Sequence, residues 1–312
     1  MNKRVVCVLM AMLMAMSLIL TGCSASANEM ETEEKAKNVE ITIGSKLFTE
    51  NIILSKMLVK YLEHNGYQVV DESGLGATGV ARAALVSGQI DAYWEYTGTV
   101  LIHFMEHDPV YESEESYEIV KEWDEANNGL LWLNYAPVNN TYCLVARKDF
   151  MEENNISTIS DLGKSIQNGD NVRFVSNPEY FERPDGMPHV EKSYGFELPE
   201  SNKVLLDLGL FYEALKNNEG DVTTGFTTDG TIDAFGFGVL EDDKAVFPVY
   251  NATPVFRKEI IDAYPELPEL VNKLSALIDN ETAMKLNKSV DVDGKDIDEI
   301  AVEFLKENGL IN

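Results

Sequence analysis

Aromatic and anion-binding side chains gather where the predicted strands of this sequence end. In open α/β sheets, ligands bind beyond the carboxyl ends of the strands, so these positions are the first candidates for a site. One group is aromatic and consists of Trp94, Tyr96, Phe226 and Tyr250 at strand ends, with Tyr142 at the start of another predicted strand. The other group can bind an anion: Lys46, Arg183 and the hydroxyls of Thr97 and Thr99.

The two groups together suit a zwitterion. Ring faces attract a quaternary ammonium through their quadrupoles, with roughly 0.5–2 kcal/mol per ring when water is excluded. A methylated ammonium has no N–H, so hydrogen-bond acceptors cannot hold it. A carboxylate is best bound by guanidinium, ammonium and hydroxyl donors. Thr97 and Thr99 also begin a predicted helix, where free N–H groups favour an anion.

Each of these residues also has a purely structural interpretation. A tyrosine near a strand end commonly belongs to the core or to its rim, and a single lysine such as Lys46 commonly lies on the surface. Arg183, in the sequence Arg183-Pro-Asp-Gly186, could brace its own turn through Asp185. Their shared position at strand ends favours the binding interpretation.

The elements that must position these residues alternate along the chain. Apolar patterning predicts strands over 39–43, 68–70, 89–93, 142–147, 171–175, 204–206, 221–224, 232–236 and 245–250. It predicts helices over 47–63, 78–86, 100–107, 113–126, 211–216, 267–278, 281–288 and 296–308. Strands that alternate with helices predict βαβ units and parallel sheets. We expect two α/β lobes with a cleft between them, and terminal helices that return to the first lobe.

Five motifs occur in a fixed order along the chain. They are Gly44-Ser-Lys46, Glu95-Tyr-Thr-Gly-Thr99, Asn177-Pro-Glu-Tyr-Phe-Glu-Arg-Pro-Asp-Gly186, Thr227-Thr-Asp229 and Glu241-Asp-Asp-Lys244. In these motifs the chain resembles the substrate-binding proteins of osmoprotectant ABC transporters, which take up glycine betaine, carnitine and choline. The resemblance runs from about residue 39 to the C-terminus.

The resemblance implies a two-lobed periplasmic-binding-protein fold of type II with two crossover strands. Lobe 1 is then 39–139 with 251–312, and lobe 2 is 140–250. By resemblance, Tyr96, Tyr142 and Tyr250 match three tyrosines of the family's ammonium cage, and Phe226 stands where a fourth tyrosine is usual. Asn140 stands where a carbonyl facing the cage is expected. The family's carboxylate-binding residues match these positions: Lys46, Thr99 and Arg183.

The N-terminus is typical of an export signal. Lys3 and Arg4 precede an apolar run over 5–20, and Leu20-Thr-Gly-Cys23 resembles the bacterial lipobox. We expect residues 1–22 to be a signal peptide, Cys23 to carry lipid, and 23–38 to be a flexible tether. The protein is then extracytoplasmic and anchored to the cell membrane. A plain signal peptide or a membrane anchor is the alternative, although the run is short for a span.

Composition and missing motifs exclude several classes of function. The formal net charge is −28, which argues against nucleic acid as a partner. Gly74-Leu-Gly-Ala-Thr-Gly79 fits a dinucleotide motif but lacks the acid about twenty residues on. The acids over 291–298 miss the EF-hand pattern, and the four histidines form no metal-ligand set. We expect no cofactor and no metal.

The resemblance therefore implies a solute-binding protein, not an enzyme, that delivers a glycine betaine-like zwitterion to an ABC permease. A binding protein for choline, carnitine, ergothioneine or another small amine or amino-acid derivative is the first alternative. A secreted lipoprotein enzyme is a remote one, because the sequence offers no nucleophile–base pair.

Overall fold

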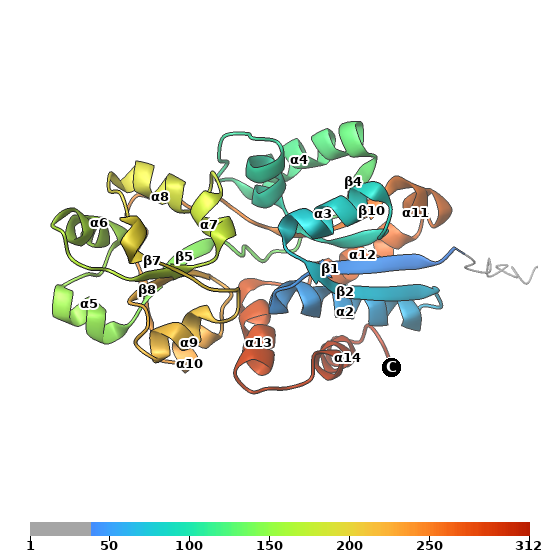
Figure 1. Cartoon of the computed structure of the whole chain (residues 1–312). Coiled ribbons are helices and arrows are strands. Elements are labelled where there is room, and N and C mark those ends of the chain that lie inside the picture. Colours follow the sequence, from blue (N-terminus) through green and yellow to red (C-terminus); the bar gives the residue numbers. More distant parts are fainter. Residues whose placement is uncertain (1–38) are drawn as a thin grey trace, which may run out of the picture. The chain divides into compact units, whose positions relative to one another are not determined.

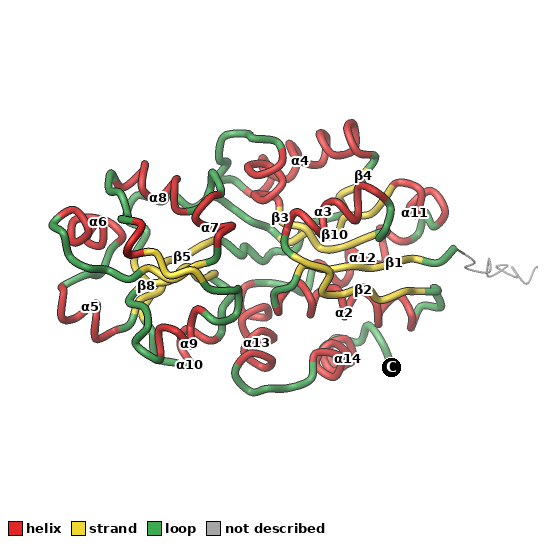
Figure 2. Tube along the Cα trace, viewed as in Figure 1, coloured by secondary structure: helices red, strands yellow, loops and turns green. Residues whose placement is uncertain are grey.

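The computed structural model describes residues 39–312, which belong to one compact unit. The predicted signal peptide, the tether and the lipid site at Cys23 lie outside the described residues. Within residues 39–312 there are two mixed five-stranded sheets, each with helices on both faces (Figures 1 and 2). In the same range, no helix is both long and apolar enough to span a membrane.

The first sheet has the order β2-β1-β3-β10-β4. Its strands are β1 (Ile41–Lys46), β2 (Val69–Gly76), β3 (Ala92–Tyr96), β4 (Leu130–Trp132) and β10 (Ala252–Arg257). β1 pairs in parallel with β2 and β3, and β10 runs antiparallel to β3 and β4. In Figure 1, α3 (Thr78–Ser87) and α4 (Ser113–Asn128) lie on one side of β1 and β2, and α2 (Thr49–His64) and α14 (Ile297–Glu307) on the other. Because both faces are covered, β1 and β3 are buried almost throughout.

The second sheet has the order β7-β6-β8-β5-β9. Its strands are β5 (Tyr142–Ala146), β6 (Phe174–Ser176), β7 (Lys203–Leu205), β8 (Val222–Phe226) and β9 (Gly238–Leu240). β6 pairs in parallel with β7 and β8, whereas β5 runs antiparallel to β8 and β9. Its helices are α5 (Lys148–Asn154), α6 (Ile159–Gln167), α7 (Pro178–Glu182), α8 (Met187–Tyr194), α9 (Phe211–Lys216) and α10 (Thr231–Ala234).

Two segments carry the chain between the sheets. One joins β4 to β5 and the other joins β9 to β10, and they meet at an antiparallel bridge between Asn139 and Asn251. The Asn139 side chain accepts a hydrogen bond from the Tyr250 N–H (2.7 Å), and the Asn140 N–H donates to the Tyr250 carbonyl (3.0 Å). These bonds hold the two crossing segments side by side.

The terminal helices return to the first sheet, as the sequence predicts. The remaining helices are the π-helix η1 (Thr99–Phe104), the 3-10 helix η2 (Glu200–Asn202), α11 (Lys258–Ala263), α12 (Leu267–Ser275) and α13 (Asn280–Asp291). α12 contacts β10, and α13 and α14 pack on α2. α13 also contacts α10 of the second sheet, so this helix touches elements of both sheets.

Three predictions about the elements are wrong. The sheets are mixed and not parallel, because β5 and β10 each enter a sheet directly from the other one, without a crossover helix to reverse their direction. The segment 232–236 is not a strand: α10 and the turn after it occupy it, since a short apolar run does not distinguish strand from helix. The segment 245–250 is irregular, and the strand follows it as β10.

Candidate functional site

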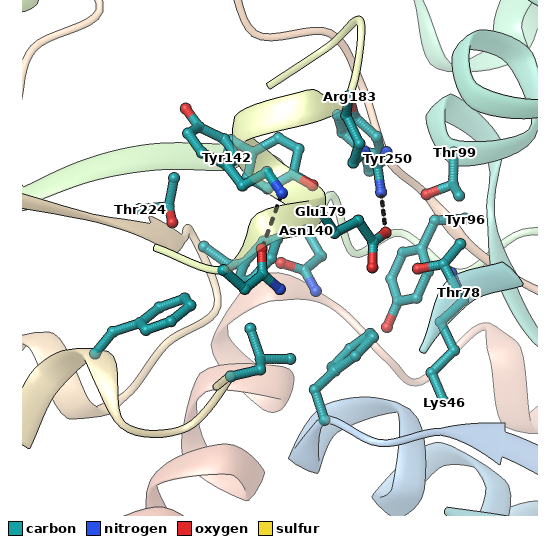
Figure 3. Close-up of a pocket in the computed structure, with 16 residues that line it drawn as sticks. Lys46, Thr78, Tyr96, Thr99, Asn140, Tyr142, Glu179, Arg183, Thr224 and Tyr250 are labelled. Atoms are coloured by element: carbon teal, nitrogen blue, oxygen red, sulfur yellow. Dashed lines mark hydrogen bonds and ion pairs between the residues drawn. The ribbon is translucent and has the colours of Figure 1, made fainter. Parts of the chain in front are cut away.

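A pocket opens between residues of the two sheets (Figure 3). Its empty volume is about 620 Å³, counting space open to solvent. β1, β3 and η1 contribute from the first sheet, and β5, β8 and α7 from the second. The residues that line it are Lys46, Phe48, Thr78, Tyr96, Thr99, Asn140, Tyr142, Asn177, Glu179, Tyr180, Arg183, Leu208, Phe211, Thr224, Phe226 and Tyr250. Seven of the nine aromatic and anion-binding candidates of the sequence, all except Trp94 and Thr97, are among them.

Tyr142 lies at the centre of the aromatic lining. Its ring centroid is 5.0 Å from that of Phe226 and 5.5 Å from that of Tyr250, and the Tyr250 ring stands nearly perpendicular to it, at 79°. β5 pairs with β8 so that Tyr142 is opposite Phe226, which explains their contact. Trp94, the other aromatic candidate, is fully buried in the core and does not line the pocket.

Phe48 connects Tyr96 to the other rings. Its centroid is 5.9 Å from Tyr96 and 6.3 Å from Phe226, with the latter pair stacked at 14°. Phe48 precedes the first turn of α2, and sequence reasoning misses it because the apolar pair Leu47-Phe48 fits the pattern of the helix itself. Tyr180, which is 5.2 Å from Tyr142, is also missed, although it lies inside the Asn177–Gly186 motif.

Gly98 gives the Tyr250 ring its space. A Cβ at this position would lie 2.5 Å from the Val249 carbonyl oxygen and 2.8 Å from the Tyr250 ring. Burial raises the pKa values of Tyr96 and Tyr250 well above the ordinary tyrosine value, so both hydroxyls stay protonated and donate.

Lys46 is buried, and its charge is already paired. Its Nζ lies 2.5 Å from Oε1 of Glu95 and 5.2 Å from the centroid of the Tyr96 ring. Its backbone N–H donates to the Asn51 side chain (2.7 Å), which fixes the end of β1. Burial lowers the pKa of Lys46, and the Glu95 carboxylate opposes part of that shift.

Arg183 is also buried and held by acids. Its Nε and Nη2 donate to both oxygens of Asp185, at 2.8 and 2.6 Å, while Nη1 donates to Glu179 (2.9 Å). The Tyr250 hydroxyl donates to the same Asp185. Burial acts to raise the pKa of Asp185, but the Arg183 hydrogen bonds outweigh it and lower that pKa. The bracing contact with Asp185 therefore exists, and the same guanidinium also lines the pocket.

Two threonine hydroxyls border the same space as the cations. Thr99 is the first residue of η1 and is 5% exposed, and Thr78 is the first residue of α3. Thr78 lies inside the glycine-rich segment over 74–79, so the apparent dinucleotide motif borders the pocket through this residue. Thr97 does not line the pocket, because its hydroxyl accepts from the Asn251 N–H in the crossing segments.

Among the described residues, no cluster of His, Cys, Asp or Glu is arranged to hold a metal ion. Asp296, one of the acids over 291–298, caps α14 by accepting from the Glu299 N–H (3.1 Å).

The comparisons with known proteins agree with this geometry. The family model described as the substrate binding domain of an ABC-type glycine betaine transport system matches residues 39–307. The chain belongs to this family. It is 38% identical over 278 residues to the glycine-betaine-binding protein of Pseudomonas aeruginosa, covering 87% of this chain and 89% of that one.

Two further relatives extend the likeness. The chain is 32% identical over 311 residues to the carnitine transport binding protein OpuCC of Listeria monocytogenes, covering 99% of this chain and 98% of the relative. The structure of apo YehZ from Escherichia coli superposes with a TM-score of 0.63 at 32% identity, covering 87% of this chain and 99% of that one. The predicted family and the two-lobed periplasmic-binding-protein fold are therefore confirmed.

Proposed function

We propose that this protein is an extracytoplasmic solute-binding protein that captures a quaternary-ammonium zwitterion of the glycine betaine type and delivers it to an ABC permease. The observation that carries the proposal is a single pocket lined by aromatic rings and by two buried cations. Family membership supports the same class of function.

In this proposal the methylated ammonium lies among Tyr96, Tyr142, Phe226 and Tyr250. The rings of Phe226 and Tyr250 both contact Tyr142, and Phe48 lies between Phe226 and Tyr96. The ring faces replace water around a cation that has no N–H to donate, at roughly 0.5–2 kcal/mol per ring. Several rings acting together therefore supply useful affinity without a covalent or ionic partner.

The carboxylate of the ligand binds Arg183, Lys46 and the Thr99 hydroxyl. Arg183 keeps Asp185 as its bidentate partner, because that carboxylate is fully buried and also bound by Tyr250. Glu179 is the more exposed of the two acids on Arg183, with 29% of its side chain accessible. We expect the ligand carboxylate to displace Glu179 from Nη1 when it binds.

Closure of the two lobes follows from where these residues lie. Lobe 1 (39–139 and 251–312) carries Tyr96, Lys46 and Thr99, and lobe 2 (140–250) carries the others. A ligand that contacts both lobes favours the closed arrangement, because only that arrangement makes all the contacts. The paired segments at Asn139 and Asn251 are the proposed hinge of this closure. The closed form is the shape that a permease recognises. Cys23 is the proposed site of the lipid anchor.

Isothermal titration of the purified protein tests the proposal. The ligands are glycine betaine, proline betaine, carnitine, choline and ergothioneine, and glycine is the control because it has the carboxylate but no methyl groups. We expect saturable binding of at least one quaternary amine and no binding of glycine. Absence of heat with all five ligands, or equal affinity for glycine, would refute the proposed function.

A further inference from the structure

A buried carboxylate without a cationic partner lies behind the pocket wall. Glu50, in the first turn of α2, is 5% exposed and takes part in no ion pair within residues 39–312. Its partners are neutral donors: the Tyr96 hydroxyl (2.7 Å) and the Asn140 amide (2.8 Å) on Oε1, and the Asn287 amide (3.1 Å) on Oε2. Three such donors offset the cost of burying the negative charge.

Two of those donors line the pocket, so the charge is one side chain away from any ligand. Tyr96 and Asn140 are both pocket residues, and a single oxygen of Glu50 holds both. Because the Asn140 Nδ2 is bonded to Glu50, its Oδ1 is left as the free end of the amide, and that atom is buried with no hydrogen-bond partner among the described residues. A buried oxygen that has no hydrogen-bond donor suits a methylated ammonium, because this cation has no N–H and carries its charge on C–H groups.

Apart from Glu50, each buried cation of the pocket is balanced by one buried carboxylate. Lys46 is paired with Glu95, and Arg183 is paired with Asp185 and shares Glu179. Glu50 is then an uncompensated negative charge beside the aromatic lining. Because Glu50 is buried and only one side chain away from the pocket, water and salt screen its interaction with a ligand only weakly.

We propose that Glu50 is a specificity-determining residue. It makes the site prefer a ligand with a positively charged nitrogen to a ligand of the same shape that lacks this charge. It attracts the ammonium directly, and it fixes the Tyr96 ring and the Asn140 amide in the orientations that receive the cation. The inference rests on the proposed function, because it concerns the same pocket. A purely structural role is the alternative, since Asn287 also donates to the Thr228 carbonyl (3.0 Å) and so links α13 to the second lobe.

The test compares glycine betaine with 3,3-dimethylbutanoate, which keeps the shape and the carboxylate and replaces the charged nitrogen by carbon. Both ligands are titrated into the wild-type protein, Glu50→Gln and Glu50→Asp. We expect Glu50→Gln to weaken glycine betaine about tenfold and to strengthen 3,3-dimethylbutanoate, because the removed charge attracts one ligand and repels the other. Glu50→Asp keeps the charge and should keep the preference for glycine betaine.

Three results would overturn the inference. If Glu50→Gln weakens the binding of both ligands equally, Glu50 has a packing role. The same conclusion follows if Glu50→Asp loses the preference for glycine betaine as fully as Glu50→Gln does. An unchanged affinity for glycine betaine in Glu50→Gln would show that the charge does not reach the ligand. If the wild-type protein binds none of the five quaternary amines, the proposed function itself fails, and this inference fails with it.

Discussion

Replacing Tyr142 separates the contribution of an aromatic face from that of apolar bulk. Tyr142→Leu removes the ring at the centre of the aromatic lining, where it contacts Phe226, Tyr250 and Tyr180. Leucine keeps most of the apolar surface but has no quadrupole. Tyr142→Phe is the matched control, because it keeps the ring face, and among the described residues the Tyr142 hydroxyl has no hydrogen-bond partner.

The expected loss follows from the energy of one cation–ring contact. At roughly 0.5–2 kcal/mol per ring, Tyr142→Leu should weaken the binding of glycine betaine by about 2- to 30-fold. The central position of Tyr142 favours the upper half of that range. Tyr142→Phe should change the dissociation constant by less than about threefold, because its ring keeps the electrostatic attraction.

Titration calorimetry measures both variants, and thermal unfolding without ligand checks that each is folded. Tyr142 is 9% exposed, so Tyr142→Leu should also lower the melting temperature, and binding is measured well below it. If Tyr142→Leu binds glycine betaine as tightly as the wild-type protein does, the aromatic lining does not hold the ammonium. If Tyr142→Phe loses as much affinity as Tyr142→Leu, the hydroxyl and not the ring face is responsible.

Three further predictions concern the rest of the pocket and its surroundings. Arg183→Ala should weaken glycine betaine and carnitine at least about tenfold more than choline, which has no carboxylate; equal losses in titrations of all three would reject the carboxylate role. Gly98→Ala should weaken glycine betaine several-fold, because its Cβ would lie 2.8 Å from the Tyr250 ring and displace it; unchanged binding would show that the ring is not needed where it lies. Burial raises the pKa of Asp229 to about 7, so the folded state binds this proton more tightly than the unfolded state does, and stability is lost as the pH rises from about 4 through 7. Asp229→Asn should remove that loss, which the size of the pKa shift limits to about 4 kcal/mol. A variant whose free energy of unfolding falls with rising pH as steeply as that of the wild-type protein would refute the assignment.

The sequence predicts elements best where local signals are strong. The predicted helix over 78–86 ends within one residue of α3, because Gly88 stops it in a left-handed conformation (φ 77°) that glycine adopts without strain. The apolar run that begins at Tyr142 predicts the start of β5 correctly. β10 is not predicted from the sequence, because Pro254 lies inside it and proline argues against a central strand.

The pairing of charges in the site depends on contacts that no local pattern contains. Lys46 and Glu95 are 49 positions apart and meet only because β1 and β3 are neighbours in the sheet. The sequence therefore indicates Lys46 as an anion-binding candidate but does not predict its ion pair with Glu95. Glu50 is missed for the same reason: its partners Asn140 and Asn287 come from distant parts of the chain.

A crystal structure of the protein with glycine betaine bound would show how the pocket holds the ligand. We expect the trimethylammonium group among Tyr96, Tyr142, Phe226 and Tyr250, with ring centroids within about 6 Å of the nitrogen. We expect the carboxylate within hydrogen-bond distance of Arg183. A ligand bound outside this pocket, or one bound inside it with the carboxylate among the rings and the ammonium at Arg183, would refute the proposed binding mode.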